Sequence, residues 1–268
     1  MRNIRLTLAY DGTDYVGWQK QPNGRSVQST VESAVAQLTG EPAKLIAAGR
    51  TDAGVHALGQ VANFRTNASL SCDNIRTGLQ HFVPADISIR AVEDVPLDFH
   101  ATYSAKQKRY RYVIHNSAIT HPFLRMYAWR LTGELDAGAM HAAGGVLVGR
   151  HDFRSFESHF PNKATSVRTV SELTVRRSHI WPLAGIGQPQ ALPPPSSDQG
   201  EFVVLDIVAD GFLYNMVRAI VGTLIKVGRG QWTAADVGRI LEQQDRAGAG
   251  ETAPAHGLYL VCVDYDEE

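Results

Sequence analysis

Hydrophobic spacing in the first hundred residues changes between the period of a strand and that of a helix. Ile4, Leu6 and Leu8 alternate with polar residues, which predicts a half-buried strand near the N-terminus. An apolar stripe at helical spacing follows Ser26 and stops at Gly40, so the sequence predicts a helix with Ser26 as its N-cap. Further strands are predicted at residues 44–48, 59–65 and 87–92, with a short helix around residues 75–82.

The second half follows a similar plan of strands and helices. Apolar runs predict strands at residues 109–115, 126–131, 170–177, 201–208 and 258–265. One helix is predicted with Met140, Ala143 and Leu147 on one face, and the most apolar helix at residues 213–227. Thr233 begins another helix with a capping-box pattern.

These elements predict an α+β chain of two similar halves, residues 1–105 and residues 106–268, with a mixed, mostly antiparallel sheet. The halves join near residues 104–108, and we expect them to share one continuous sheet. Residues 182–200 contain five Pro and three Gly, which predicts a long loop in the second half.

The composition fits a soluble globular protein with a hydrophobic core. Of the 268 residues, 44% are hydrophobic and 20% are charged, and the length suits one large or two small domains. No stretch reaches the roughly 18 consecutive apolar residues of a membrane span, and the N-terminus lacks the apolar block of a signal peptide. We therefore expect a cytoplasmic protein without a membrane partner.

A formal net charge of −1 does not by itself indicate a protein that binds nucleic acid. Local charge changes this picture, because Lys106, Lys108, Arg109 and Arg111 lie close together among tyrosines. This run fits both a surface that contacts RNA and an ordinary solvated strand, and the residues alone favour neither.

Several common catalytic motifs are absent from the sequence. It has no phosphate loop, no dinucleotide-binding fingerprint and no serine at a nucleophile elbow. The ten histidines lack the spacings typical of zinc ligands, and two cysteines are too few for a disulfide framework or a multi-cysteine zinc site. The sequence therefore predicts neither a metal nor a nucleotide cofactor.

The stretch IAAGRTDAGVHA, residues 46–57, places Arg50 and Asp52 in a turn between two predicted strands. An Asp beside Gly in a turn ordinarily bonds its own backbone. A nearby cation such as Arg50 would instead keep the carboxylate ionised and able to act as a nucleophile. From this stretch alone the turn role is favoured. His56 would share a helix face with Asp52, but Gly54 and the flanking strand patterns argue against a helix.

Two residues of the second half offer partners for Asp52. Arg218 lies within the most apolar predicted helix and needs a counter-charge or water. Either the side chain reaches the surface or a carboxylate such as Asp52 pairs with it. Tyr110 presents an aromatic face that either stacks on a nucleobase or packs within its strand.

Six blocks of sequence, in order, resemble the tRNA pseudouridine synthase A family over nearly the whole chain. They are AYDGTDYVGWQKQ, AAGRTDAGVHALGQVANF, DFHATYSAKQKRYRYVI, GRHDFRSF, GFLYNMVRAIVGTLIKVGRG and APAHGLYLVCVDY. The second block, which contains Asp52, is highly specific to the family. The evident departure is the segment 182–200, which is longer than the usual hairpin tip.

The resemblance implies a homodimeric, cofactor-free isomerase with the pseudouridine synthase α+β fold and a central RNA-binding cleft. It implies the conversion of uridines 38, 39 and 40 in the anticodon stem-loop of tRNA to pseudouridine. By the same resemblance, Asp52 is the nucleophile and Tyr110 contacts the target base. Arg218 is the arginine paired with the catalytic Asp, and Arg50 takes part in flipping the base.

Two further segments match parts of the family that touch tRNA. They are Phe99, His100, Ala101, Thr102 and Tyr103 in the first half, and Ser166, Val167, Arg168, Thr169 and Val170 in the second. We also assign Lys106, Lys108, Arg109 and Arg111 to contact with the RNA backbone. Strand geometry limits this assignment, because the side chains of Arg109 and Tyr110 must point to opposite faces.

Two other functions remain open on the residues. One is an Asp/His hydrolase that uses Asp52 and His56. The other is a non-catalytic module that binds tRNA or acts as an RNA chaperone, in which Asp52 is only a turn residue.

Overall fold

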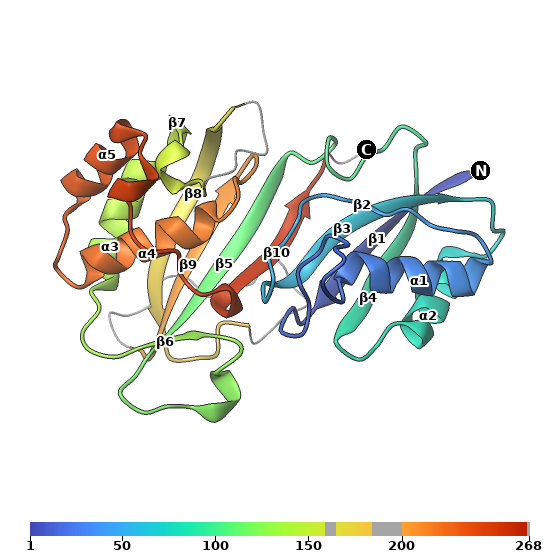
Figure 1. Ribbon diagram of the computed structural model, residues 1–268, viewed down its shortest axis with the longest axis horizontal. Helices are drawn as coiled ribbons and strands as arrows, with labels where there is room; N and C mark the ends of the chain where they lie inside the picture. Colours follow the sequence, from blue (N-terminus) through green and yellow to red (C-terminus); the bar gives the residue numbers. More distant parts are fainter. Residues whose placement is uncertain (159–164, 184–199, 267–268) are drawn as a thin grey trace. The chain divides into compact units, whose positions relative to one another are not determined.

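The computed structural model describes residues 1–158, 165–183 and 200–266, and the chain divides into two compact units (Figure 1). The first unit consists of Met1–Lys106 together with Tyr259–Glu268, and the second of Gln107–Leu258. The last strand therefore belongs with the N-terminal unit, in contrast to the predicted halves 1–105 and 106–268. Most of the predicted loop 182–200 lies outside the described residues, at positions 184–199.

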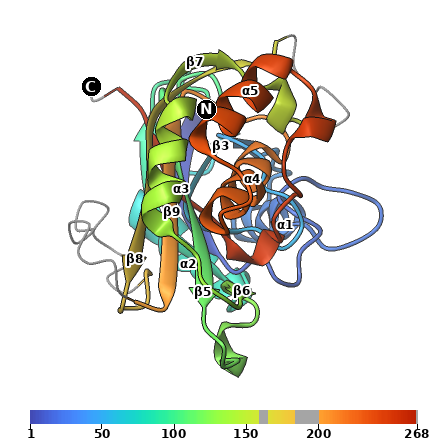
Figure 2. The same ribbon diagram turned by 90° about the vertical axis from the view of Figure 1, so that its left-hand side faces the viewer.

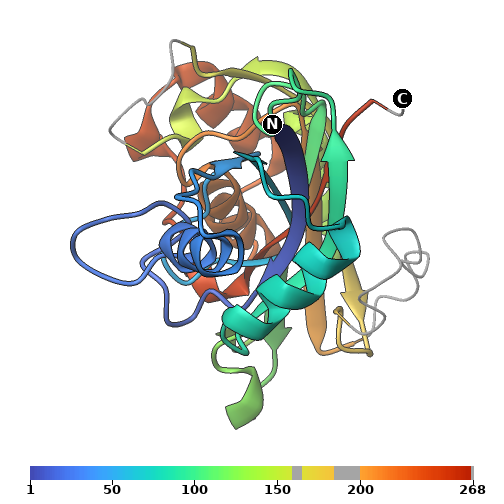
Figure 3. The same cartoon turned by 90° about the vertical axis from the view of Figure 1, so that its right-hand side faces the viewer.

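The first unit is a sheet with two helices. Its elements are β1 (Arg2–Tyr10), α1 (Val27–Thr39), β2 (Ile46–Ala47), β3 (His56–Thr66), α2 (Cys72–Phe82), β4 (Ile87–Val95) and β10 (Leu258–Asp264). The strand order is β4-β1-β3-β10, with β2 on β3. Strand β1 runs antiparallel to both β3 and β4, whereas β3 and β10 run parallel. Figure 3 shows α1 and α2 on one side of this sheet.

The local structure of the first unit follows the predicted pattern closely. Ile4, Leu6 and Leu8 are fully buried, while the residues between them are partly exposed. Ser26 caps α1 by accepting a hydrogen bond from the amide of Ser29. Gly40 ends the helix with a φ of 74°, a conformation that glycine adopts without strain.

The second unit is also a sheet, with three helices packed on one face (Figure 2). Its elements are β5 (Gln107–Asn116), β6 (Trp129–Leu131), α3 (Ala137–Gly144), β7 (Gly149–Asp152), β8 (Val167–Ser178), β9 (Phe202–Ala209), α4 (Met216–Gly228) and α5 (Ala234–Gln243), with short 3-10 turns between some of them. Strands β5, β9, β8 and β7 pair antiparallel in that order, and β6 runs parallel to β5. The prediction of an α+β chain with a mixed, mostly antiparallel arrangement of strands is confirmed.

Two strands are shorter than predicted because other groups take their backbone hydrogen bonds. The amide of Leu45 donates to the side chain of Glu32 on α1, and its carbonyl accepts from Gln28, so β2 begins only at Ile46. Before β6, the amides of residues 127 and 128 both donate to the carbonyl of Leu124 and form a turn.

Two features of the second unit were not predicted. Strand β7 consists of Gly-Arg-His-Asp and lacks the apolar alternation by which strands are recognised. Helix α4 begins at Met216 rather than at residue 213, because Asn215 adopts a left-handed conformation with a φ of 61°. The capping box of Thr233 and Asp236 on α5 is present as predicted.

Glycines set the distance between α4 and the chain before β10. A Cβ atom on Gly222 would lie 1.7 Å from the carbonyl oxygen of Glu251. We expect Gly222→Ala to lower the free energy of unfolding by about 1–3 kcal/mol, because the added methyl group forces the helix away from this segment. Thermal denaturation followed by circular dichroism measures the effect. Gly145→Ala is the matched control, since its Cβ would meet nothing within 4 Å, and an equal loss in both variants would contradict the interpretation.

Candidate active site

The turn of residues 49–55 connects β2 to β3 and carries Arg50 and Asp52. The amide of Val55 donates to the carbonyl oxygen of Asp52 at 3.1 Å, and Gly54 has a φ of 76°, so this segment is a turn and not a helix. Asp52 is half-buried, whereas Arg50 is exposed. The predicted turn is confirmed, and it presents a carboxylate and a guanidinium two residues apart.

The loop of residues 10–18 holds this turn by hydrogen bonds. Tyr10 Oη lies 2.8 Å from Thr51 Oγ1, and the amide of Trp18 donates to the carbonyl oxygen of Thr51 at 3.0 Å. Gln60, on β3, donates from Nε2 to the carbonyl oxygen of Gly49 at 2.9 Å. Burial raises the pKa of Tyr10 to about 12, so its hydroxyl keeps its proton at neutral pH.

Two glycines let the loop backbone touch the turn backbone. A Cβ atom on Gly12 would lie 2.0 Å from the carbonyl oxygen of Val55, and one on Gly17 would lie 2.6 Å from that of Thr51. Gly17 also has a φ of 106°, which other residues rarely adopt. From the sequence alone, residues 10–24 are predicted only to form a loop rich in turn residues and aromatics. The glycines at 12 and 17 were the available signal for a close backbone contact.

His56 begins β3 directly after the turn and is 2% exposed. Its Nδ1 accepts a hydrogen bond from the amide of Gly12 at 3.1 Å and lies 3.1 Å from Asp11 Oδ1. The ring stacks on Tyr259 of β10, with centroids 4.8 Å apart. Nδ1 therefore contacts both the backbone and a carboxylate of the loop of residues 10–18.

Residues 99–103, one of the predicted tRNA-contacting segments, lie in the first unit and connect to β2. Thr102 Oγ1 donates to the carbonyl oxygen of Ala47 at 2.6 Å, two residues before the turn begins. The amide of Ala101 donates to the buried side chain of Asn63. His100 stacks against Tyr103 with ring centroids 4.2 Å apart, and Tyr103 is 84% exposed. This segment therefore presents an aromatic surface to solvent.

Tyr110 and Arg218 belong to the second unit. Tyr110 lies on β5, is 7% exposed and meets the ring of Phe212 edge-on at 5.0 Å. Arg218 lies on α4 and is half-buried, with Nε donating to the carbonyl oxygen of Ala253 and Nη1 to Asn215 Oδ1, both at 2.7 Å. These two neutral acceptors fix the direction of the guanidinium. A carboxylate partner for Arg218 stays a prediction.

The other predicted tRNA-contacting segment, residues 166–170, lies at the start of β8. Ser166 Oγ donates to Glu157 Oε2 at 2.6 Å, and both residues are buried. Arg168 is 7% exposed and donates to the backbone carbonyl oxygens of Thr165 and Val167. The alternation of the strand leaves Val167 and Thr169 as its more accessible members.

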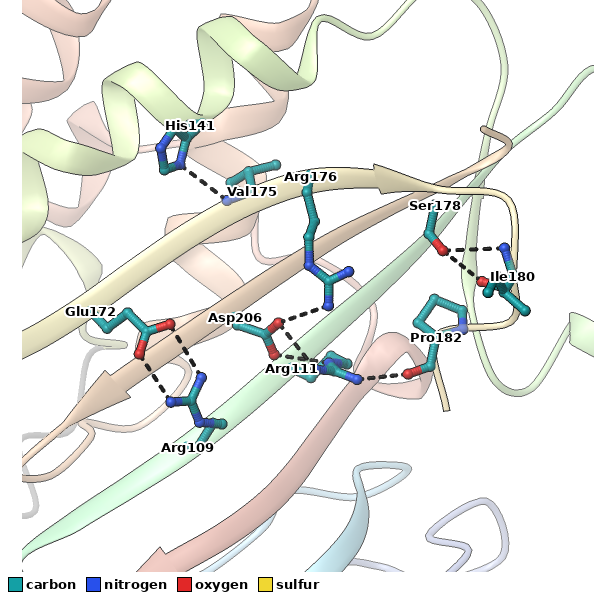
Figure 4. A network of polar contacts seen from close by, with 10 residues as sticks. All are labelled: Arg109, Arg111, His141, Glu172, Val175, Arg176, Ser178, Ile180, Pro182 and Asp206. Carbon is teal, nitrogen blue, oxygen red and sulfur yellow. Dashed lines mark hydrogen bonds and ion pairs between the residues drawn. The ribbon is translucent and has the colours of Figure 1, made fainter. Parts of the chain in front are cut away.

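Arg109 and Arg111 both form ion pairs on the face of the sheet opposite to Tyr110 (Figure 4). Arg111 binds Asp206 through Nε at 2.8 Å, and both side chains are almost fully buried. Arg109 binds Glu172 at 2.9 Å nearer the surface. The expectation that Arg111 contacts the RNA backbone is therefore wrong, because its charge is already paired within the sheet.

Arg176 approaches the same carboxylate of Asp206 at 3.5 Å. Burial lowers the pKa of Arg176, while the Asp206 carboxylate acts in the opposite direction. Of the other two cations in the predicted cluster, Lys108 is 9% exposed and Lys106 forms an exposed ion pair with Asp266 at 2.8 Å.

The first unit thus brings Arg50, Asp52 and residues 99–103 into one connected set, and the second unit holds Tyr110, Arg218 and residues 166–170. A meeting of the two sets around one substrate stays a prediction. Within residues 1–158, 165–183 and 200–266 no group of three His, Cys, Asp or Glu side chains is arranged to hold a metal ion. The helices in this part of the chain are too short or too polar to cross a membrane.

Comparisons with known proteins agree on one family. The sequence model described as tRNA pseudouridine synthase matches residues 7–104 and 143–266. A tRNA pseudouridine synthase A of Acetivibrio thermocellus is 45% identical over 265 residues, which cover 99% of this chain and 100% of the relative. Proteins of the same name are 44% identical in Roseiflexus sp. (100% and 92% covered) and 42% identical in Geobacter sp. strain M21 (100% of both chains).

A solved structure of a Cbf5-Nop10-Gar1 complex aligns with a TM-score of 0.31 and 9% identity, covering 98% of this chain and 58% of that chain. A likeness this weak adds nothing to the assignment.

The pairing of Arg111 gives a test of its role. We expect Arg111→Met to lower the free energy of unfolding by about 3 kcal/mol, because it leaves a buried carboxylate with one cation in place of two. The matched variant Arg109→Met, whose ion pair is partly exposed, should cost less than about 1 kcal/mol. Urea denaturation measures both. A loss of RNA affinity in Arg111→Met without a loss of stability would restore the RNA-contact role.

Proposed function

The chain belongs to the tRNA pseudouridine synthase family, and on this premise we propose that it acts on uridines 38, 39 and 40 in the anticodon stem-loop of tRNA. The protein is an isomerase that converts uridine to pseudouridine in tRNA. The observation that carries the finer proposal is the complete GRTDAGVHA block in a turn braced by residues 10–18. The full-length match to relatives named tRNA pseudouridine synthase A supports it further.

The reaction moves a base without changing its oxidation state. The N-glycosidic bond of uridine breaks, the uracil turns, and C5 of the base forms a carbon–carbon bond to C1′ of the ribose. The proton on C5 must then leave, so that atoms and charge balance. A base that is stacked within a stem first has to be turned out of it, at a cost of a few kcal/mol.

We assign the nucleophile to Asp52. A carboxylate that stays ionised in a partly desolvated site can attack either the ribose C1′ or C6 of the uracil. Asp52 is half-buried, and the turn around it is fixed at Thr51 and at Val55. This rigidity supports the role, because attack requires the carboxylate to be held within a fraction of an ångström of its target.

Arg50 and Tyr110 act on the flipped base in this proposal. The exposed side chain of Arg50 occupies the space that the base leaves in the stem and binds the phosphate backbone. Tyr110, held by its edge-on contact with Phe212, stacks on the uracil while it rotates. Both roles need a residue with little freedom to move away, and the rigid Tyr110 environment suits this requirement.

Arg218 supplies the positive charge that keeps Asp52 ionised. Its guanidinium is already oriented by Ala253 and Asn215, so an ion pair would cost little additional side-chain entropy. The tRNA backbone would then lie along Tyr103 and His100 in the first unit and along Val167 and Thr169 in the second. Such contacts position the stem-loop without reading its sequence.

The nucleophile assignment predicts the outcome of one substitution. We expect Asp52→Asn to slow the release of tritium from tRNA labelled at C5 of uridine by at least about 10⁴-fold, because the amide cannot attack. Affinity for tRNA should stay unchanged. Full release by this variant would contradict the nucleophile, and no release by the wild-type protein would contradict the isomerase itself.

Two controls separate this proposal from its alternatives. A tRNA with cytidine at positions 38, 39 and 40 should release no tritium above background if those uridines are the targets. A hydrolase that uses Asp52 and His56 would cleave its substrate instead of releasing tritium. A non-catalytic RNA-binding module would function equally well with Asn at position 52.

We also propose a homodimer in the cytoplasm, with a central cleft that holds the stem-loop. The full-length similarity to the family supports this arrangement. Size-exclusion chromatography with light scattering should give about twice the chain mass of 29.3 kDa, and a mass of one chain at micromolar concentration would contradict the dimer.

A further inference from the structure

His56 is a buried titratable group that the proposed reaction does not use. It follows the catalytic turn directly, and its contacts reach the loop that braces the turn. We propose that His56 is a positioning residue for Asp52, and that it acts only while its Nδ1 carries no proton. This inference rests on the proposed role of Asp52 as the nucleophile.

The hydrogen bond from Gly12 fixes the protonation state of the ring. A backbone amide is only a donor, so His56 Nδ1 must offer a lone pair to accept it at 3.1 Å. In the neutral imidazole the proton then sits on Nε2. The stacked ring of Tyr259 holds the plane of the imidazole, with an angle of 20° between the two rings. The acceptor is therefore aimed at Gly12.

The loop of residues 10–18 is attached to the turn at two places, one on each side of Asp52, and the hydrogen bond from Gly12 to His56 belongs to the second. On one side, Thr51 is tied to Trp18 and Tyr10. On the other side, Gly12 touches the carbonyl group of Val55 and is held there by His56. The carboxylate of Asp52 lies on the short segment between these attachments. If either one opens, the turn gains freedom and the carboxylate loses its fixed position.

A proton on Nδ1 would break the second attachment. The protonated nitrogen can no longer accept from Gly12, and it would donate to Asp11 Oδ1, which lies 3.1 Å away. Asp11 Oδ1 also accepts from the amide and hydroxyl of Thr13, which hold the carboxylate beside the ring. The Gly12 amide would face another N–H group in a buried place, which is costly, so the loop must move. Asp11 contacts the ring from the loop, and Tyr259 contacts it from β10.

Three substitutions test the positioning role in the full-length protein with tRNA labelled at C5. His56→Asn keeps an acceptor oxygen near the position of Nδ1 and does not titrate, so its kcat should stay within about threefold of wild type. His56→Leu keeps the volume but has no acceptor. Its kcat should fall about 10- to 100-fold with KM nearly unchanged, because the carboxylate is misplaced while the RNA surface is intact. His115→Leu is the matched control, since His115 is equally buried in the second unit and should leave kcat unchanged.

The pH dependence of kcat gives a readout that a merely structural role would not change. In the wild type, kcat should fall as the pH decreases through the protonation of His56. This decrease should be absent in His56→Asn, because the asparagine side chain does not titrate. In Asp11→Asn it should move to lower pH, because the carboxylate that favours the charged imidazole is gone. An identical acid limb in the wild type and in His56→Asn would overturn the inference.

Hydrogen–deuterium exchange of the peptide that covers residues 11–18 tests the attachment without any substrate. Exchange should be at least about tenfold faster in His56→Leu than in the wild type and nearly unchanged in His56→Asn. Unchanged exchange in His56→Leu, or full activity of that variant, would overturn the inference alone. Wild-type protein that releases no tritium would instead overturn the proposed function, so the two failures are distinguishable.

Discussion

The direct contact between the backbone of residues 10–18 and the turn of residues 49–55 determines the geometry of the first unit. Only glycine fits at positions 12 and 17, because a Cβ atom at either would collide with a carbonyl oxygen of the turn. Loop and turn are therefore joined by direct backbone contact as well as by the side chains of Tyr10 and His56. The backbone position of Asp52 then depends on where β1 ends and β3 begins. This is a more rigid support than side-chain packing alone could provide.

Two arginines in the second unit differ in their burial and in their described contacts. Arg111 forms a buried ion pair with Asp206, and this pair joins β5 to β9. Arg218 donates to the backbone carbonyl oxygen of Ala253 and to the amide oxygen of Asn215, and these two contacts orient its guanidinium. Burial of a cation is expensive in either case. The nearly complete burial of the Arg111–Asp206 pair suits Arg111 to a structural role, whereas the half-buried Arg218 is the arginine to which the proposed function assigns the ion pair with Asp52.

Sequence patterns predicted most strands and helices because alternation and helical stripes report burial directly. The patterns predicted β2 too long, because Leu45 bonds to Glu32 of α1 instead of to a strand. They missed β7, because it is a short edge strand of mostly polar residues. Only the family resemblance favours Asp52 as the nucleophile over a turn residue, because a carboxylate in a glycine-rich turn is common. The pairing of Arg111 could not be predicted, since the register that places it opposite Asp206 depends on residues 95 positions apart. The proposed role of Gly12 and His56 depends on a contact between two segments that lie 44 positions apart, so local sequence patterns could not predict it either.

Strand β10 is the last element of the first unit to be synthesised. It pairs with β3 at His56 and Ala57, although the whole second unit lies between the two strands in the sequence. A growing chain on the ribosome can fold β1, β3 and β4 early, but the imidazole of His56 has no Tyr259 ring to stack on until the second unit has been synthesised. The edge of β3 at His56 and Ala57 likewise stays unpaired until that moment, whereas β2 pairs with Ala62 and Asn63. The order of translation thus delays the complete support of the turn of residues 49–55 until the second unit has already emerged.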